Sequence, residues 1–310
     1  MSDTAFLFPG QGSQSAGMGK LLAERYPAAR RAFEEADDAL SFPLSQLCFE
    51  GPIEELTKTE NTQPALLAVS IAAYRVLLEQ GIRPKMVAGH SLGEYSGLVA
   101  AGSLDFGDAI RLVRQRGRYM QEAVPPGVGA MAAVLKFPQG ELERVLVEAA
   151  QGEVVSAANY NSPDQIVIAG HATAVKRAME LAKAAGARKI KLLPVSAPFH
   201  CQLMKPAQEK LKPHLDATRF SALSIPLINN WEARQIATAD EARQGLYEQI
   251  PNPVRWTESV RALAAAGIRR IVEVGPGSVL LGLARNIDPT LTGIKFGEPS
   301  DLEKAQDAFS

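Results

Sequence analysis

A serine between two glycines is the first feature of this sequence that could do chemistry. The segment "AGHSLGEYSG", residues 88 to 97, places Ser91 two residues after Gly89 and two residues before Gly93. This G-x-S-x-G spacing allows a sharp turn between a strand and a helix, with the hydroxyl exposed at the tip as a nucleophile. The preceding "KMVA" fits a strand end, and the residues from Leu92 onward fit a helix. An ordinary glycine-serine turn gives the same pattern, so the motif alone leaves both interpretations open.

A nucleophilic serine needs a base, and the chain has four histidines. His90 is adjacent to Ser91, but adjacent residues of an extended segment point in opposite directions, so His90 is poorly placed. His171 opens a predicted helix, and His214 lies among lysines after a proline. His200 follows a predicted strand at the boundary of two predicted domains and is the best candidate for the base. The alternative is a histidine that is only hydrogen-bonded beneath a loop.

A hydrolase triad would add a carboxylate between the serine and the histidine in chain order. Asp105, Asp108 and Asp164 lie in that interval, but each has a structural role at a predicted helix start or turn. A serine–histidine pair held by backbone carbonyls is possible instead. The neutral imidazole N–H needs an acceptor, which does not have to be charged.

One arginine lies on the apolar face of a predicted helix, residues 105 to 124. At about 100° per residue, Arg116 falls within the apolar arc, whereas Arg111, Arg114 and Arg118 fall opposite to it. An arginine that faces a core is rare unless it is paired with an anion, and its fork suits a carboxylate. The partner is either an Asp or Glu of the protein, in a structural salt bridge, or a carboxylate that arrives with the substrate.

Strand-like runs alternate with helical ones along most of the chain. "TAFLF" precedes a glycine-rich loop, and "NTQPALLAVSIAAYRVLLEQG" predicts a buried helix that is capped by Asn61 and ended by Gly81. This alternation predicts an α/β fold with a mostly parallel sheet and helices on both faces. Gly10, Gly89 and Gly275 follow predicted strands, at the carboxyl ends where such sheets bind ligands.

Residues 127–196 have a different pattern, with the predicted order β-α-β-β-α-β of a ferredoxin-like unit. We interpret the chain as a large α/β domain, residues 1–126 and 197–310, with this small domain inserted at 127–196. A cleft between two domains is a common ligand site, and His200 follows the insert directly.

Composition limits the classes of function. The 310 residues are 46% hydrophobic and 22% charged with a net charge of -1, so nothing indicates bulk attraction to nucleic acid. Cys48 and Cys201 are far apart, which suggests neither a zinc site nor a disulfide framework and fits a reducing cytosol. The N-terminus lacks the basic region of a signal peptide, and the longest apolar run is too short to cross a bilayer.

Eight segments between residues 8 and 280 are more specific together than any one of them alone. They are "FPGQGSQ", "TQPALLA", "GHSLGEYSGLVAAG", "RGRYMQEAVPPGVGAMAAV", "NSPDQIVIAG", "PFHCQLMKPA", "QIPNPVRWTESV" and "EVGPGSVL". In this order they resemble the malonyl-CoA:acyl carrier protein transacylase family over nearly the whole chain. The resemblance implies an α/β-hydrolase-like large domain with a ferredoxin-like insert.

The resemblance also implies an activity, the transfer of malonyl from malonyl-CoA to the phosphopantetheine thiol of an acyl carrier protein, for fatty acid biosynthesis. Ser91 would carry the malonyl group, His200 would act as its base, and Arg116 would bind the malonyl carboxylate. Because malonyl-CoA is a substrate, no metal or bound cofactor would be needed. We expect a cytoplasmic monomer with no nucleic-acid or membrane partner.

Backbone groups complete the site that the resemblance implies. The N–H groups of Gln11 and Leu92 would form the oxyanion hole, and the carbonyl of Gln249 would orient His200. Phe199 stands where some relatives have serine, a difference that changes the shape expected of the pocket beside the base.

Other functions share parts of this pattern. A malonyltransferase of a polyketide or malonate decarboxylase system would use the same residues. A serine esterase or thioesterase would share the glycine-flanked turn, but it should show an orienting acid and has no use for Arg116. A non-catalytic carrier-binding subunit would not need Ser91, His200 and Arg116 together.

Overall fold

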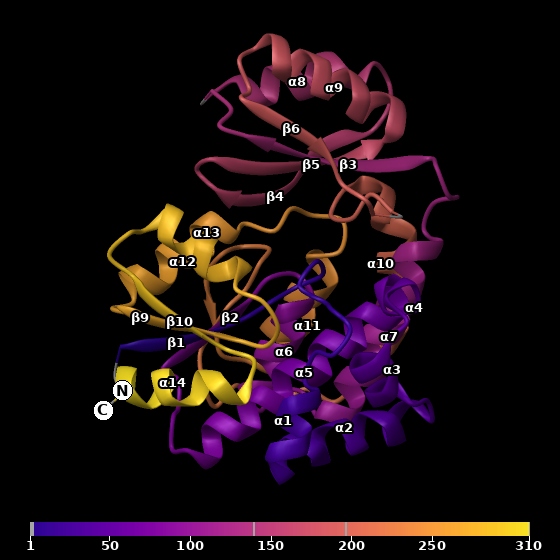
Figure 1. The fold of residues 1–310 in the computed structure, drawn as a ribbon. Helices are drawn as coiled ribbons and strands as arrows, with labels where there is room; N and C mark the ends of the chain where they lie inside the picture. The colour runs from indigo at the N-terminus through magenta and orange to yellow at the C-terminus, as the bar shows by residue number, and fades with distance from the viewer. Residues whose placement is uncertain (1–2, 139, 196, 310) are drawn as a thin grey trace.

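Two β-sheets organise the part of the chain that the computed structural model describes, residues 3–138, 140–195 and 197–309 (Figure 1). The larger sheet has the strand order β10-β9-β1-β2-β7-β8, and the smaller one has the order β4-β5-β3-β6. The strands are β1 (Thr4–Phe8), β2 (Met86–Gly89), β3 (Gly129–Leu135), β4 (Val155–Ser162), β5 (Gln165–His171), β6 (Lys189–Leu192), β7 (Leu227–Ile228), β8 (Gln235–Ile236), β9 (Arg270–Val274) and β10 (Thr292–Phe296).

Helices cover both sheets. They are α1 (Lys20–Arg25), α2 (Pro27–Leu40), α3 (Leu44–Glu50), α4 (Ile53–Thr57), α5 (Thr59–Glu79), α6 (Leu92–Ala100), α7 (Phe106–Glu122), α8 (Glu141–Ala150), α9 (Ala172–Ala184), α10 (Lys205–Ala217), α11 (Ala239–Glu248), α12 (Trp256–Ala265), α13 (Val279–Ile287) and α14 (Leu302–Phe309), with the 3-10 helices η1 (Gln202–Met204) and η2 (Pro299–Asp301). Among the described helices, none combines the length and the apolar character that a membrane span requires.

The larger sheet is parallel except at one edge, where β8 pairs antiparallel with β7. Side chains of its central strand β1 alternate between two layers, as the pleat requires. Phe6 and Phe8 join the core formed with α5 and α6, whereas Ala5 and Leu7 join the core formed with α12 and α13. The predicted parallel-rich sheet with helices on both faces is therefore confirmed.

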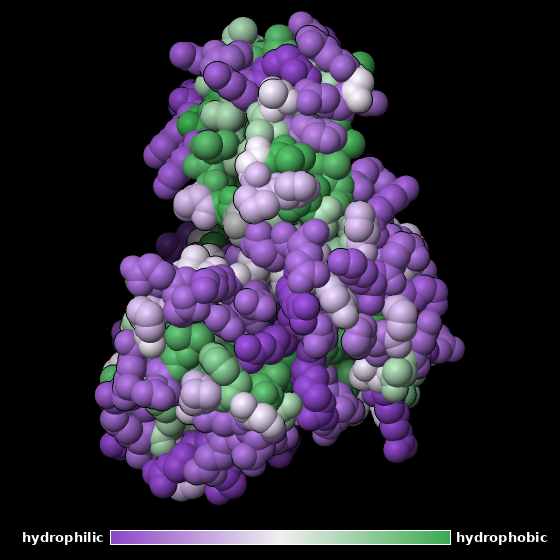
Figure 2. All heavy atoms as spheres, turned by 90° about the vertical axis from the view of Figure 1, so that its right-hand side faces the viewer, coloured by the Kyte–Doolittle hydropathy of each residue, from purple (hydrophilic) through white to green (hydrophobic). Residues whose placement is uncertain are grey.

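The smaller sheet is antiparallel, and its elements follow one another as β3, α8, β4, β5, α9 and β6. Ala132 and Val134 of β3 pack with α8 and α9 on the outer face, whereas Met131 packs into the core of the larger part. On the face shown in Figure 2, hydrophobic side chains gather between the hydrophilic tip of this upper part and its junction with the part below, which is mostly hydrophilic. The proposed boundary at residue 196 lies outside the described residues.

The start of α5 differs from the prediction. Asn61 was the predicted cap, but α5 begins at Thr59, and Lys58 occupies the capping position. The Asn61 side chain instead donates to the carbonyl oxygen of Glu55 in α4 (2.9 Å), so a tertiary contact uses the group that would have capped the helix. Gly81 follows the helix end with a φ of 75°, as expected of a residue that terminates a helix.

Candidate active site

Ser91 lies at the sharp turn between β2 and α6. Its backbone is strained, with φ 52° and ψ -105°. A Cβ at Gly89 would clash with the carbonyl group of Gly93, and a Cβ at Gly93 would clash with the carbonyl oxygen of Phe8. Both glycines are needed because the backbone passes so closely here, and the turn presents the Ser91 hydroxyl above the carboxyl ends of the parallel strands.

The Ser91 hydroxyl is paired with His200. Ser91 Oγ donates to His200 Nε2 at 2.8 Å, and His200 Nδ1 donates to the carbonyl oxygen of Gln249 at 2.8 Å. Because a carbonyl only accepts, the proton of the neutral ring is on Nδ1, and Nε2 is free to take the serine proton. Asp105 caps α7 by accepting from the Asp108 N–H (3.1 Å), so that acid has the structural role that the sequence indicates.

Burial keeps the imidazole of His200 neutral. Removal from water, and secondarily the nearby positive charge of Arg116, lowers the pKa of His200 to about 3. The histidine is therefore unprotonated at neutral pH, which is the state that a general base requires.

Arg116 is buried in α7, with 1% of its surface exposed. Its Nη1 donates to Gln63 Oε1 (2.9 Å), and its Nη2 donates to Gln249 Oε1 (2.7 Å) and to Ser91 Oγ (3.1 Å). These acceptors are all neutral oxygens. Burial lowers the pKa of the guanidinium from its usual high value. Among the described residues no carboxylate contacts Arg116 directly, so the simple structural salt bridge is not what the structure contains.

A cavity of about 120 Å³ opens over this pair, at the junction of the two sheets. Ser91, Arg116 and His200 line it from the larger part, and Met131 and Leu193 line it from the small sheet and the segment that follows β6. The site is therefore assembled from both parts of the chain.

The remaining predicted site residues also lie at this cavity. Gln11, Leu92 and Phe199 line it, and Gln249 lies behind it, bonded to both His200 and Arg116. Leu92 is the first residue of α6, where a backbone N–H has no acceptor within the helix.

The other histidines pair with groups other than the Ser91 hydroxyl. His90 also lines the cavity, but its Nε2 pairs with Asn161 Oδ1 at 2.8 Å. His171 precedes α9, and the exposed His214 pairs with the hydroxyl of Tyr119 (2.9 Å). This arrangement agrees with the choice of His200 as the partner of the serine.

Four further groups contribute to the site without having been expected from the sequence: Gln63, Glu94, Asn230 and the side chain of Gln249. Gln63 lies in "TQPALLA" and Glu94 in "GHSLGE", two segments that carried the resemblance. Asn230 had no such signal, because it follows the two-residue strand β7. Its contacts with the serine turn span 139 residues of sequence.

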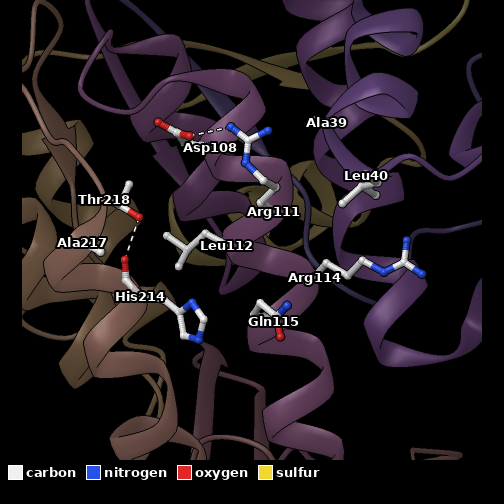
Figure 3. A pocket seen from close by; sticks show the side chains of 10 residues that line it. All are labelled: Ala39, Leu40, Asp108, Arg111, Leu112, Arg114, Gln115, His214, Ala217 and Thr218. Atoms are coloured by element: carbon white, nitrogen blue, oxygen red, sulfur yellow. Dashed lines mark hydrogen bonds and ion pairs between the residues drawn. The ribbon is translucent and has the colours of Figure 1, made fainter.

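A wider groove lies on the opposite side of α7, between α2 and α10 (Figure 3). Its charged groups have partners within the protein, since Arg111 pairs with Asp108 (2.6 Å) and Arg114 stacks on the ring of Phe42. The groove presents the solvent-facing arginines of α7, whereas Arg116 faces the cavity with the serine.

Both cysteines are buried free thiols. Burial raises the pKa of Cys201 to about 11, and its Sγ donates to the carbonyl oxygen of Pro198. Within the described ranges, no cluster of three or more His, Cys, Asp or Glu side chains could hold a metal ion.

Comparison with known proteins shows which family the chain belongs to. Residues 5–292 match the model of the acyl transferase domain. The chain is 51% identical to malonyl CoA-acyl carrier protein transacylase of Escherichia coli K12, over 98% of this chain and 99% of that protein. A crystal structure of an acyl carrier protein S-malonyltransferase from Vibrio cholerae superimposes with a TM-score of 0.96 at 46% identity, covering 98% of this chain and 100% of that one.

A second similar structure contains a partner. It is a malonyl-transacylase in complex with a type II PKS acyl-carrier protein. The match has a TM-score of 0.96 at 46% identity and covers 99% of this chain and 100% of that one. The fold and the family model define an acyltransferase. The chain belongs to the malonyl CoA-acyl carrier protein transacylase family.

Proposed function

We propose that this protein transfers malonyl from malonyl-CoA to the phosphopantetheine thiol of an acyl carrier protein, through a malonyl ester of Ser91, for fatty acid biosynthesis. The observation that carries this proposal is the 3.1 Å contact between Arg116 Nη2 and Ser91 Oγ. In malonyl-CoA the free carboxylate is two bonds from the carbonyl carbon that the serine attacks. A buried guanidinium beside Oγ is therefore within reach of that carboxylate and can pair with it in bidentate fashion.

Acylation begins when His200 Nε2 takes the proton of Ser91 Oγ as the oxygen attacks the thioester carbonyl. The backbone N–H groups of Gln11 and Leu92 stabilise the oxyanion that develops, a contribution in which one donor is worth roughly 10²–10³-fold in rate. The carbonyl of Gln249 orients the ring by accepting from Nδ1. The C–S bond then breaks, and the CoA thiol leaves with the proton from His200.

The second half-reaction reverses these steps. The carrier thiol loses its proton to His200, attacks the malonyl ester, and leaves Ser91 protonated again. These steps need only protein groups and the two substrates, so the proposal includes no metal and no bound cofactor.

Two other functions remain as alternatives. The similarity to a malonyl-transacylase bound to a type II PKS carrier favours polyketide synthesis as a second setting for the same reaction. A serine esterase or thioesterase would hydrolyse the ester instead. That alternative leaves the buried Arg116 without a substrate partner.

We also propose the domain description that the sequence suggested. Residues 1–126 and 197–310 would form an α/β-hydrolase-like domain, and residues 127–196 would form a ferredoxin-like insert. The strand-turn-helix around Ser91 supports the first part. The antiparallel order β4-β5-β3-β6, with two helices on one face, supports the second.

Intact-mass spectrometry tests the proposed function. Incubation with malonyl-CoA should add one malonyl group to the protein, and a carrier with its phosphopantetheine arm should then remove it and gain that mass. Ser91→Ala should gain nothing. Release of free malonate at the same rate with or without carrier would support the esterase alternative and contradict the proposal.

A further inference from the structure

Glu94 is a carboxylate with no exposed surface, directly behind the reacting pair. It lies in the first turn of α6, and its Oε2 accepts two hydrogen bonds. One comes from the backbone N–H of Asn230 (3.0 Å), and the other comes from Gln249 Nε2 (2.7 Å). The two donors lie in different segments, after β7 and at the end of α11, so Glu94 joins these segments beneath the cavity.

The Asn230 arm of this network holds the serine turn. Asn230 Nδ2 donates to the carbonyl oxygen of Gly89 (2.7 Å), and its Oδ1 accepts from the backbone N–H of Ser91 (2.6 Å). One side chain thus ties the residues on both sides of His90. Such a clamp can maintain the strained backbone of Ser91, which persists only when its surroundings impose it.

The Gln249 arm holds the histidine and the arginine. Its backbone carbonyl accepts from His200 Nδ1, its Oε1 accepts from Arg116, and its Nε2 donates to Glu94. An arginine only donates and a carboxylate only accepts, so the pair of partners permits one orientation of this amide. Without Glu94, the Nε2 group keeps its longer contact with the backbone carbonyl oxygen of Ser91 (3.5 Å), but the amide loses the short contact that fixes its orientation.

A simple helix cap does not explain this placement. In a capping box, the residue at the position of Glu94 accepts from the backbone N–H of the N-cap, here Ser91. That N–H donates to Asn230 instead, and the Glu94 carboxylate points inward toward Gln249. The carboxylate is thus committed to the groups that orient the site.

We propose that Glu94 is a positioning residue for the malonyl transfer proposed above, on which this inference rests. Its carboxylate ties Asn230 to Gln249 and so fixes the nucleophile and the base relative to each other. A displacement of about 1 Å between reacting groups can cost roughly 10²-fold in rate, so loss of this tie acts on turnover more than on binding.

The test measures the acylation half-reaction by rapid quench in Glu94→Ala and Glu94→Gln. We expect Glu94→Ala to lower kcat by roughly 10²-fold with little change in KM for malonyl-CoA. Glu94→Gln should restore most of that loss, because its carbonyl oxygen can still accept both hydrogen bonds. A Glu94→Ala enzyme with kcat within about threefold of wild type would overturn the proposal.

Glu273 provides a matched control. It is also fully buried, lies near the end of β9, and accepts from the Leu281 N–H (3.0 Å) at the start of α13, outside the site. Glu273→Ala and Glu273→Gln should lower stability without changing the acylation kcat. If Glu273→Ala lowered kcat as much as Glu94→Ala, a general loss of stability would explain the result, and the positioning role would be wrong.

A pH profile provides a second readout that does not depend on the alanine variant folding. Burial raises the pKa of Glu94 to about 7, although Arg116 of α7 opposes this shift. Tyr95 is its titratable neighbour within α6, and the groups that face it from β7 and α11 are uncharged, namely Asn229, Asn230, Gly245 and Gln249.

Ionisation of Glu94 strengthens both of the hydrogen bonds that it accepts. The neutral acid, like the amide of Glu94→Gln, still accepts both hydrogen bonds, so the wild-type kcat for acylation should rise only a few-fold with pH through an apparent pKa near 7, and Glu94→Gln should abolish this step. Retention of the step in Glu94→Gln would contradict the proposal. Failure of the wild type to become malonylated would instead refute the proposed function, so the two failures are distinguishable.

Discussion

At the scale of single residues, we propose that the environment of Arg116 sets the preference of the site between acyl groups. The guanidinium is buried against neutral oxygens of Gln63, Gln249 and Ser91. Among the described residues, the guanidinium reaches a carboxyl group only indirectly, through the amide of Gln249, which donates to Glu94. A substrate carboxylate would supply a direct partner, and an acetyl group would not.

We expect Arg116→Ala to remove most of the preference for malonyl-CoA over acetyl-CoA. Breaking a buried, hydrogen-bonded ion pair costs on the order of 3–5 kcal/mol, or roughly 10²-fold to several thousand-fold, and this loss should fall on malonyl-CoA. Loss of the contacts with Ser91 and Gln249 should affect both esters alike. The measurement is kcat/KM for both esters in the wild type and the variant. An equal reduction for the two esters would mean that Arg116 is structural.

His200 should make the protein less stable in acid. Burial and then Arg116 lower the pKa of His200 to about 3 in the folded protein, whereas an unfolded histidine titrates near 6.5. Between these values the unfolded state binds the additional proton, so the free energy of unfolding falls as the pH decreases below about 6.5, by at most ~1.4 kcal/mol per pH unit.

Urea unfolding of the wild type and His200→Asn at pH 7, 6 and 5 measures this contribution. The variant should lose less stability on acidification, because it lacks the group that must stay neutral when folded. If the free energy of unfolding fell equally with pH in both proteins, His200 would not be the cause of the loss of stability in acid.

At the scale of elements, the serine turn depends on how closely α6 approaches β1. A methyl group at Gly93 would meet the backbone carbonyl of Phe8, whereas one at Gly282, in the exposed part of α13, would meet no atom within 4 Å. Gly93→Ala should therefore destabilise the protein by ~1–3 kcal/mol and displace Ser91. Gly282→Ala should stabilise it by ~0.5–1 kcal/mol and leave acylation unchanged.

Thermal unfolding and the acylation rate of both variants provide the measurement. A Gly93→Ala protein with wild-type stability and rate would show that the backbone can yield here, and that the close approach of α6 is not required for the turn.

Elements with a strong local pattern could be predicted from the sequence. β1 and β2 are mostly apolar runs, and β1, β2 and β9 each end at a glycine or within two residues before one. The apolar periodicity of α7 correctly predicted that Arg116 is buried. β7 and β8 could not be predicted in this way, because each has two residues and depends on its neighbours. The network around Glu94 was equally inaccessible, since its partners lie 136 and 155 residues away in sequence.

At the scale of the whole molecule, the cavity lies where the small sheet meets the larger part, so we propose that a carrier approaches along this junction. The residues after β6 line the cavity, and the exposed side chains of β6 itself include Lys189 and Lys191. The net charge of the chain is only -1. Any attraction for an acidic carrier must therefore come from local groups such as these rather than from the overall charge.

We therefore expect transfer to the carrier to weaken with salt more than acylation by malonyl-CoA does. The screening length shortens from about 10 Å at 0.1 M to about 3 Å at 1 M, which removes steering between large charged surfaces.

Lys189→Glu with Lys191→Glu should raise KM for the carrier several-fold at low salt and leave acylation unchanged. Lys176→Glu, an exposed change on α9 at the outer side of the same sheet, is the control. Equal salt dependence of the two half-reactions, or an equal effect of the control, would place carrier docking elsewhere on the surface.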